Sequence, residues 1–169
     1  MIDLAKFWLK ELNDEVPATE KCLERIDEKY WEFKPHPKSM PMGYLALLVA
    51  EIPLWITTML EKGEIDFASF KHAQVKNNGE LVSHFKENVD GLRNALAHAS
   101  EESVHRVFYL KAGGKELFRA LNNEYITPTY HHWVHHRGQL TVYMRLCDIP
   151  VPSVYGPSAD DNSFRNQTH

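Results

Sequence analysis

The chain has 169 residues, of which 43% are apolar and 25% charged, and its formal net charge at pH 7 is −4. This length suits a single domain with one hydrophobic core, and we expect one domain over residues 1–169. A mildly acidic chain without a block of lysines and arginines is not expected to bind nucleic acid. The longest apolar run, residues 44–50, is too short for a membrane span of about 20 residues, so we expect no membrane partner.

The cysteines and the N-terminus indicate a cellular compartment. Cys22 and Cys147 are too far apart in sequence to suggest a disulfide framework or a zinc ribbon. The first residues lack the basic start and apolar block of a signal peptide. We therefore expect a cytoplasmic protein with reduced thiols.

The first segment predicts a helix, because one face carries residues at helical spacing: Leu4, Trp8, Leu12, Thr19, Leu23 and Ile26. Pro17 lacks a backbone donor, so this helix should kink or restart between residues 13 and 19. Three prolines in residues 31–41 indicate an extended crossing segment.

The second helix should begin near Pro41, with Ser39 as its cap, and should end at Gly63. It is apolar nearly all round, which is typical of a central buried helix, and Pro53 should kink it.

The third helix has the spacing of a bundle seam, with apolar residues at alternating steps of three and four: Val82, Phe85, Val89, Leu92, Leu96 and Ala99. Residues 107–110, followed by Gly113 and Gly114, indicate a short strand and a turn. A fourth helix should begin between residues 123 and 128 and run to Leu146 or Cys147. From about residue 150 an extended tail should pack across the bundle. The predicted fold is all-α, an antiparallel four-helix bundle with this strand and turn as a minor excursion.

The fourth helix carries four of the chain's ten histidines, in two pairs spaced i, i+4. His131 and His135 share one face, and His132 and His136 share a face about 100° away. Residues four apart on a helix lie one above the other, so either pair has the spacing to bind one metal ion such as zinc, nickel, copper or iron. Trp133 stands where the metalloprotease helix has its glutamate base, which argues against zinc-protease chemistry.

Three stretches of the chain closely resemble the DinB-like family: residues 33–40, 132–146 and 151–160. The resemblance implies a four-helix bundle, a homodimer, and a divalent metal (zinc, nickel or iron) held by three histidines for hydrolysis or thiol transfer. Two of those ligands correspond here to His132 and His136. The third, in the second helix, corresponds to Leu48, which cannot bind a metal.

Three outcomes remain open for this incomplete site. The histidine pair is vestigial or binds metal weakly with water in the empty positions, or Glu51 supplies a carboxylate in place of the missing histidine, or a ligand not identified here completes the site. Two functions follow. One is a metal-dependent hydrolase or thiol transferase; the other is a non-catalytic helical dimer that binds a small ligand or a partner.

Overall fold

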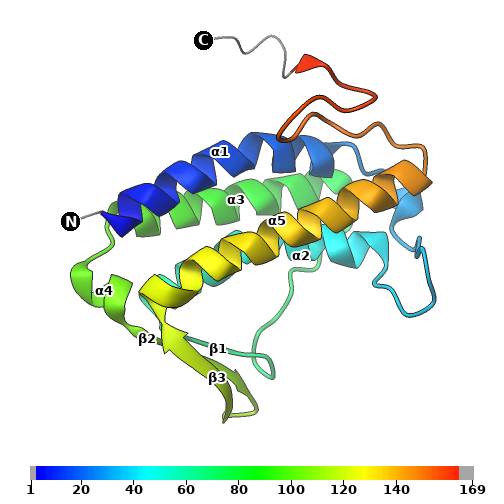
Figure 1. Ribbon diagram of the computed structural model, residues 1–169. Helices are drawn as coiled ribbons and strands as arrows, with labels where there is room; N and C mark the ends of the chain where they lie inside the picture. Colours follow the sequence, from blue (N-terminus) through cyan, green and yellow to red (C-terminus); the bar gives the residue numbers. More distant parts are fainter. Residues whose placement is uncertain (1–2, 164–169) are drawn as a thin grey trace.

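The computed structural model describes residues 3–163, which form a bundle of four long helices with a short helix and a small sheet at one end (Figure 1). The helices are α1 (Leu4–Glu24), α2 (Met42–Glu61), α3 (Asn78–Ala97), α4 (Glu101–His105) and α5 (Asn122–Leu146), and a 3₁₀ turn, η1, spans Glu28–Tyr30. The strands are β1 (Glu64–Asp66), β2 (Val107–Ala112) and β3 (Lys115–Leu121).

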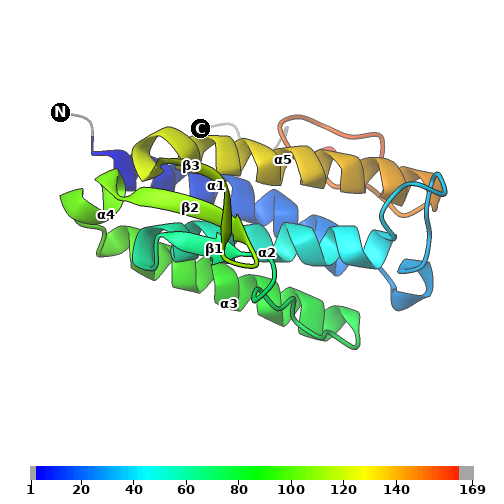
Figure 2. The ribbon, with the colours of Figure 1, turned by 90° about the horizontal axis from the view of Figure 1, so that it is seen from below.

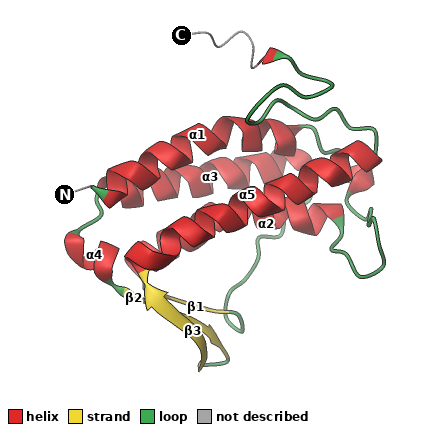
Figure 3. Cartoon of the chain, in the orientation of Figure 1, coloured by secondary structure: helices red, strands yellow, loops and turns green. Residues whose placement is uncertain are grey.

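The prediction of an all-α fold is wrong, because three strands form a mixed sheet beside α2 and α5 (Figure 3). The strand and turn predicted at residues 107–114 are present as β2 and its hairpin to β3, and Gly113 and Gly114 both have positive φ. β1, which was not predicted, pairs in parallel with β2. Its three residues carry one buried side chain, Ile65, so no local periodicity marks them as a strand.

The long helices pass through their prolines. α1 continues through Pro17 as one helix, so the predicted restart is wrong. α2 also continues through Pro53, which leaves the Val49 carbonyl without its helical N–H partner. The indole N–H of Trp133 on α5 donates to that carbonyl at 2.8 Å. The proline thus creates an acceptor that joins α2 to α5.

Both ends of α2 bear on the predictions. Its N-cap is Pro41 and no side chain caps it, so the predicted cap at Ser39 is wrong. Gly63 follows the helix with φ of 75°, as expected of a glycine at a helix C-terminus. The helix α2 is long and apolar enough to cross a membrane. However, 67% of its most apolar stretch is buried inside the protein. That burial is typical of a core helix.

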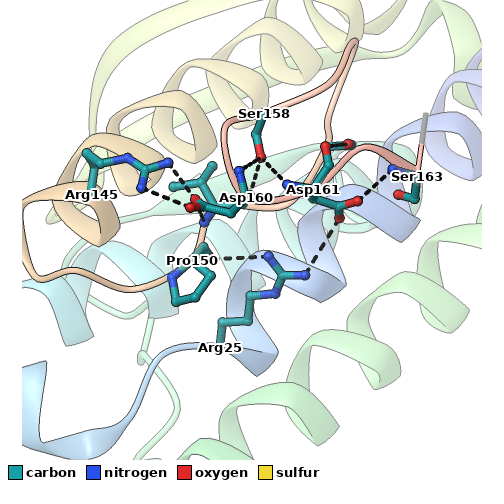
Figure 4. Close-up of polar contacts among 9 residues, drawn as sticks. Arg25, Arg145, Pro150, Ser158, Asp160, Asp161 and Ser163 are labelled. Atoms are coloured by element: carbon teal, nitrogen blue, oxygen red, sulfur yellow. Dashed lines mark hydrogen bonds and ion pairs between the residues drawn. The ribbon is translucent and has the colours of Figure 1, made fainter. Parts of the chain in front are cut away.

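The C-terminal segment packs across the ends of α1 and α5, as predicted (Figure 4). Arg145 forms an ion pair with Asp160 at 2.5 Å. Arg25 donates to the Pro150 carbonyl at 3.1 Å and faces Asp161 at 3.7 Å. Hydrogen bonds from the Ser163 side chain, and then from the backbone amides of Ser163 and Ser153, hold the pKa of the Asp161 carboxyl well below its usual range. Two arginines therefore hold this segment against the bundle.

Candidate functional site

The position of α5 against α2 determines which histidines face the protein. Trp133 contacts Val49, and Asn122 donates to the Met59 carbonyl at 2.9 Å, so the two helices run antiparallel. This orientation leaves His131 and His135 exposed, while His136 is buried and His132 half-buried. The tertiary structure therefore distinguishes the two pairs that spacing alone left equivalent.

His132 and His136 contact each other through their ring nitrogens. The two Nε2 atoms lie 2.7 Å apart, and His136 Nδ1 lies 2.8 Å from Gln139 Oε1. The amide oxygen can only accept, so His136 Nδ1 carries a proton and its Nε2 accepts from His132 Nε2–H. Two hydrogen bonds, each with its own N–H donor, thus link three side chains along one face of α5.

Both rings resist protonation. Burial lowers the pKa of His132, and the nearby rings of His136 and His135 lower it further. Burial also lowers the pKa of His136; the hydrogen bond to Gln139 opposes this effect, and His135 adds to it. We therefore treat the pair as neutral at pH 7, with hydrogen-bonding capacity but no positive charge.

A pocket of about 310 Å³ lies beside His132. Its walls come from α2, α5, the sheet and the segment after β1, and most lining side chains are apolar or aromatic: Trp55, Met59, Ile65, Phe67, Phe108, Leu110, Tyr125, Pro128, Thr129 and His132. The Thr129 hydroxyl already donates to the Tyr125 carbonyl at 2.9 Å. The buried indole N–H of Trp55 has no partner among residues 3–163, and its ring packs on His132 with centroids 5.7 Å apart. An apolar pocket with a few polar groups on its wall is typical of a small-molecule site.

Leu48 occupies the α2 position where the resemblance implies a third histidine. It lies seven residues before Trp55, hence on the same face of α2, which is the face that meets His132. Because α2 and α5 are antiparallel, Leu48 lies further toward the level of His136. Its side chain is buried, with 7% exposed. An apolar side chain therefore stands where a ligand is required.

Glu51 is bonded to residues other than the histidine pair. Its carboxylate binds His72 Nδ1 at 2.5 Å and accepts from the Ala73 amide at 2.8 Å, and His84 Nε2 on α3 lies 3.5 Å away. Within the described chain no hydrogen bond or ion pair links it to His132 or His136. The structure thus brings Glu51 together with two histidines that sequence reasoning missed. No spacing pattern marks them, because they come from a loop and from a different helix.

The described residues do not fit the three-histidine metal site that the resemblance implies. Two nitrogens on one tetrahedral zinc lie about 3.3 Å apart at Zn–N distances near 2.0–2.1 Å, whereas the two Nε2 atoms lie 2.7 Å apart and share a proton. Across residues 3–163, no three His, Cys, Asp or Glu side chains are placed to hold a metal ion.

The fold and the site define a helical-bundle protein with a paired histidine on its last helix beside an apolar pocket. The chain matches the DinB family over residues 1–167 and belongs to that family. The family predicted from the histidine-rich helix is therefore confirmed.

Solved structures agree with this fold. A DinB-like protein of Bacillus subtilis superposes with a TM-score of 0.66 at 18% identity, covering 84% of this chain and 94% of its own. A DinB-like protein of Bacillus cereus gives 0.64 at 19% identity, covering 87% and 95%. At such identities the likeness concerns the fold alone. The chain has no match among curated proteins.

Proposed function

We propose that this DinB-family protein binds a small, mainly apolar molecule in the pocket beside α5, where neutral His132 bonds the molecule's single polar group. The observation that supports this most directly is the position of His132 on the wall of an otherwise apolar pocket. A volume of about 310 Å³ is ample for a two-ring aromatic, since an engineered cavity of ~150 Å³ binds benzene. The lowered pKa of His132 favours an uncharged partner such as a hydroxyl or thiol.

The test compares two ligands of equal shape, 2-naphthol and 2-methylnaphthalene, by calorimetry or fluorescence. A hydrogen bond to His132 should make 2-naphthol bind about fivefold more tightly. His132→Leu should abolish that preference while retaining the binding of 2-methylnaphthalene. The matched control is His131→Leu, at an exposed position one residue away. Equal affinities of the wild type for both ligands, or no binding of either, would contradict the proposal.

A second candidate is the family-type enzyme, a metal-dependent hydrolase or thiol transferase. The signature pair His132–His136 favours it, because two imidazoles spaced i, i+4 supply two donors for a divalent metal. It requires a third ligand that residues 3–163 do not supply as arranged.

The test is metal binding by untagged protein. If the pair is the remainder of a metal site, Leu48→His should raise the affinity for zinc or nickel at least about tenfold, because it adds a third imidazole. Leu47→His is the matched control, because Leu47 is also buried, at 8%, but lies on a different face of α2. Equal affinities in both variants would show that Leu48 does not occupy a ligand position.

We also propose that the protein pairs with itself through the outer face of α5. Val142 and Leu146 are both 57% exposed there, and a Cβ added at Gly138 would meet nothing within 4 Å. A second helix can approach such a face closely. Sedimentation should give a dimer at micromolar concentration, and Leu146→Glu should dissociate it. The control Leu117→Glu, at a residue 54% exposed on β3, should not. A monomeric wild type would refute this pairing.

A further inference from the structure

The segment that links β1 to α3 crosses from the sheet to the start of α3 (Figure 2), and a hydrogen bond joins it to α2. We call residues 67–75 the strap. Phe67 at its start lines the pocket. Phe70 packs edge-on against Trp55, with ring centroids 6.1 Å apart, and Trp55 packs in turn on His132. One wall of the pocket therefore depends on where the strap lies.

Hydrogen bonds hold the two ends of the strap. At its start, the Asp66 carbonyl accepts from the Phe70 amide at 2.8 Å, and the Asp66 carboxylate accepts from the Gly113 and Gly114 amides of the hairpin at 2.8 and 2.6 Å. Just after its end, the Lys76 amide donates to Glu80 on α3 at 2.8 Å. These contacts fix the path of the chain only outside residues 71–75.

The middle of the strap is held by Glu51 of α2. Between residues 71 and 75, the Ala73 amide is the one backbone N–H with a hydrogen-bond partner in the described chain, and that partner is Glu51 Oε1. His72 Nδ1 contacts the other oxygen, Oε2, and His72 Nε2 lies 3.4 Å from the Tyr44 hydroxyl. A single carboxylate thus accepts from a backbone and from a side chain of the strap.

Glu51 is itself buried, with 1% of the residue exposed. A buried carboxylate is stable only when its oxygens are bonded, so the strap and the carboxylate each stabilise the other. On the side of α3, His84 Nε2 lies 3.5 Å from a Glu51 oxygen and 3.1 Å from the Asn88 amide nitrogen, and that amide donates to the Ala50 carbonyl. The carboxylate therefore lies between α3 and the strap.

We propose that Glu51 is a positioning residue for the pocket: its carboxylate latches the strap through His72 and Ala73, and the strap in turn sets the size of molecule that the pocket admits. The part about molecule size rests on the proposed function, whereas the latch does not. Release of the latch removes His72 from the ring of Phe70, against which it packs edge-on with centroids 5.3 Å apart. Phe70 then no longer holds Trp55 in place, so larger molecules enter.

The latch is tested by hydrogen exchange of the full-length protein, measured on peptides of the strap and of the helices. Glu51→Met replaces the carboxylate with an apolar side chain of similar length that suits the apolar helix α2. Exchange at the Ala73 amide, the one bonded amide of residues 71–75 in the described chain, should rise about tenfold or more, while exchange in α1, α3 and α5 stays unchanged. Unchanged exchange in the strap, or an equal rise throughout the protein, would overturn the latch.

Two further variants complete this test. His72→Ala removes one strap contact at a side chain that is 33% exposed, so the fold should tolerate it, and strap exchange should rise as well. The His72→Ala variant tests the latch if Glu51→Met does not fold. Glu101→Met is the control, because it removes an exposed glutamate that faces His105 at 3.4 Å. Faster strap exchange in the control would also overturn the latch.

The size effect is tested with 2-naphthol and the four-ring 1-hydroxypyrene. In Glu51→Met the affinity for 1-hydroxypyrene relative to 2-naphthol should rise about fivefold or more. A raised strap exchange with an unchanged affinity ratio would overturn the role in size selection. If the wild type binds neither molecule, the proposed function fails, and the exchange data still decide the latch.

Discussion

The two faces of α5 differ in how their polar side chains are bonded to the rest of the protein. On one face, Arg137 is 2% exposed and forms an ion pair with Glu15 of α1 at 2.6 Å. It also donates to the Thr19 hydroxyl at 3.0 Å and to the Tyr155 hydroxyl at 2.8 Å. On the other face, His132 and His136 bond mainly to each other, and His132 borders a pocket.

The difference shows how much the surroundings of a polar group decide its role. The charge of Arg137 has a buried counter-charge and neutral partners from two other parts of the chain, so it joins α5 to α1 and to the C-terminal segment. The histidine pair is neutral and joins no other helix by a hydrogen bond within the described residues. We therefore expect Arg137 to govern stability and His132 to govern binding.

The largest effect should come from Arg137→Met. Loss of the guanidinium leaves the Glu15 carboxylate buried without its counter-charge, which should lower the free energy of unfolding by about 3–5 kcal/mol. Urea denaturation measures this. The double variant Glu15→Met/Arg137→Met should regain most of the loss, because no buried charge remains. If Arg137→Met alone is as stable as the wild type, the Arg137 face does not govern stability and the two faces of α5 do not differ in this respect.

Tyr155→Phe should have a smaller effect on the same face. The Tyr155 hydroxyl donates to Glu15 Oε1 at 2.8 Å and accepts from Arg137. Its removal should lower the free energy of unfolding by about 1 kcal/mol, because the ion pair itself remains. The comparison is Tyr109→Phe, at an aromatic residue of β2 whose hydroxyl makes no hydrogen bond within the described chain. Equal losses in both variants would show that the tyrosine bridge contributes nothing specific.

The smallest effect should be the pH dependence that the histidine pair contributes. The folded-state pKa of both histidines is lowered, so the unfolded state binds more protons just below pH 6.5, and stability falls as the pH falls. Between pH 7.5 and 5.5 the wild type should therefore lose slightly more stability than His132→Leu/His136→Leu. The exposed pair His98→Asn/His105→Asn serves as the control. A wild type that loses less stability than the His132/His136 variant would reverse the predicted sign.

Sequence reasoning located the elements whose signal is local. The four long helices follow from apolar spacing, and the histidine-rich stretch correctly indicated the family. The sheet was predicted only in part, because β1 is three residues long and pairs with residues 45 positions later in the chain. Whether a helix continues through a proline is not a local property either. The penalty of Pro53 depends on whether its freed carbonyl finds a donor, and Trp133 supplies one from a distant helix.

The same distinction between local and long-range information applies to the candidate site. The sequence by itself determined which residues can carry chemistry, namely the two histidine pairs and Glu51, and the family resemblance implied that Leu48 stands where a third histidine would bind metal. Only the tertiary structure decided that His132 borders a pocket, that His131 is exposed, and that Glu51 binds the strap. The physical reason is that spacing along a helix fixes which side chains share a face, whereas the rotation of that helix against its neighbours depends on contacts far apart in sequence, such as that between Trp133 and Val49.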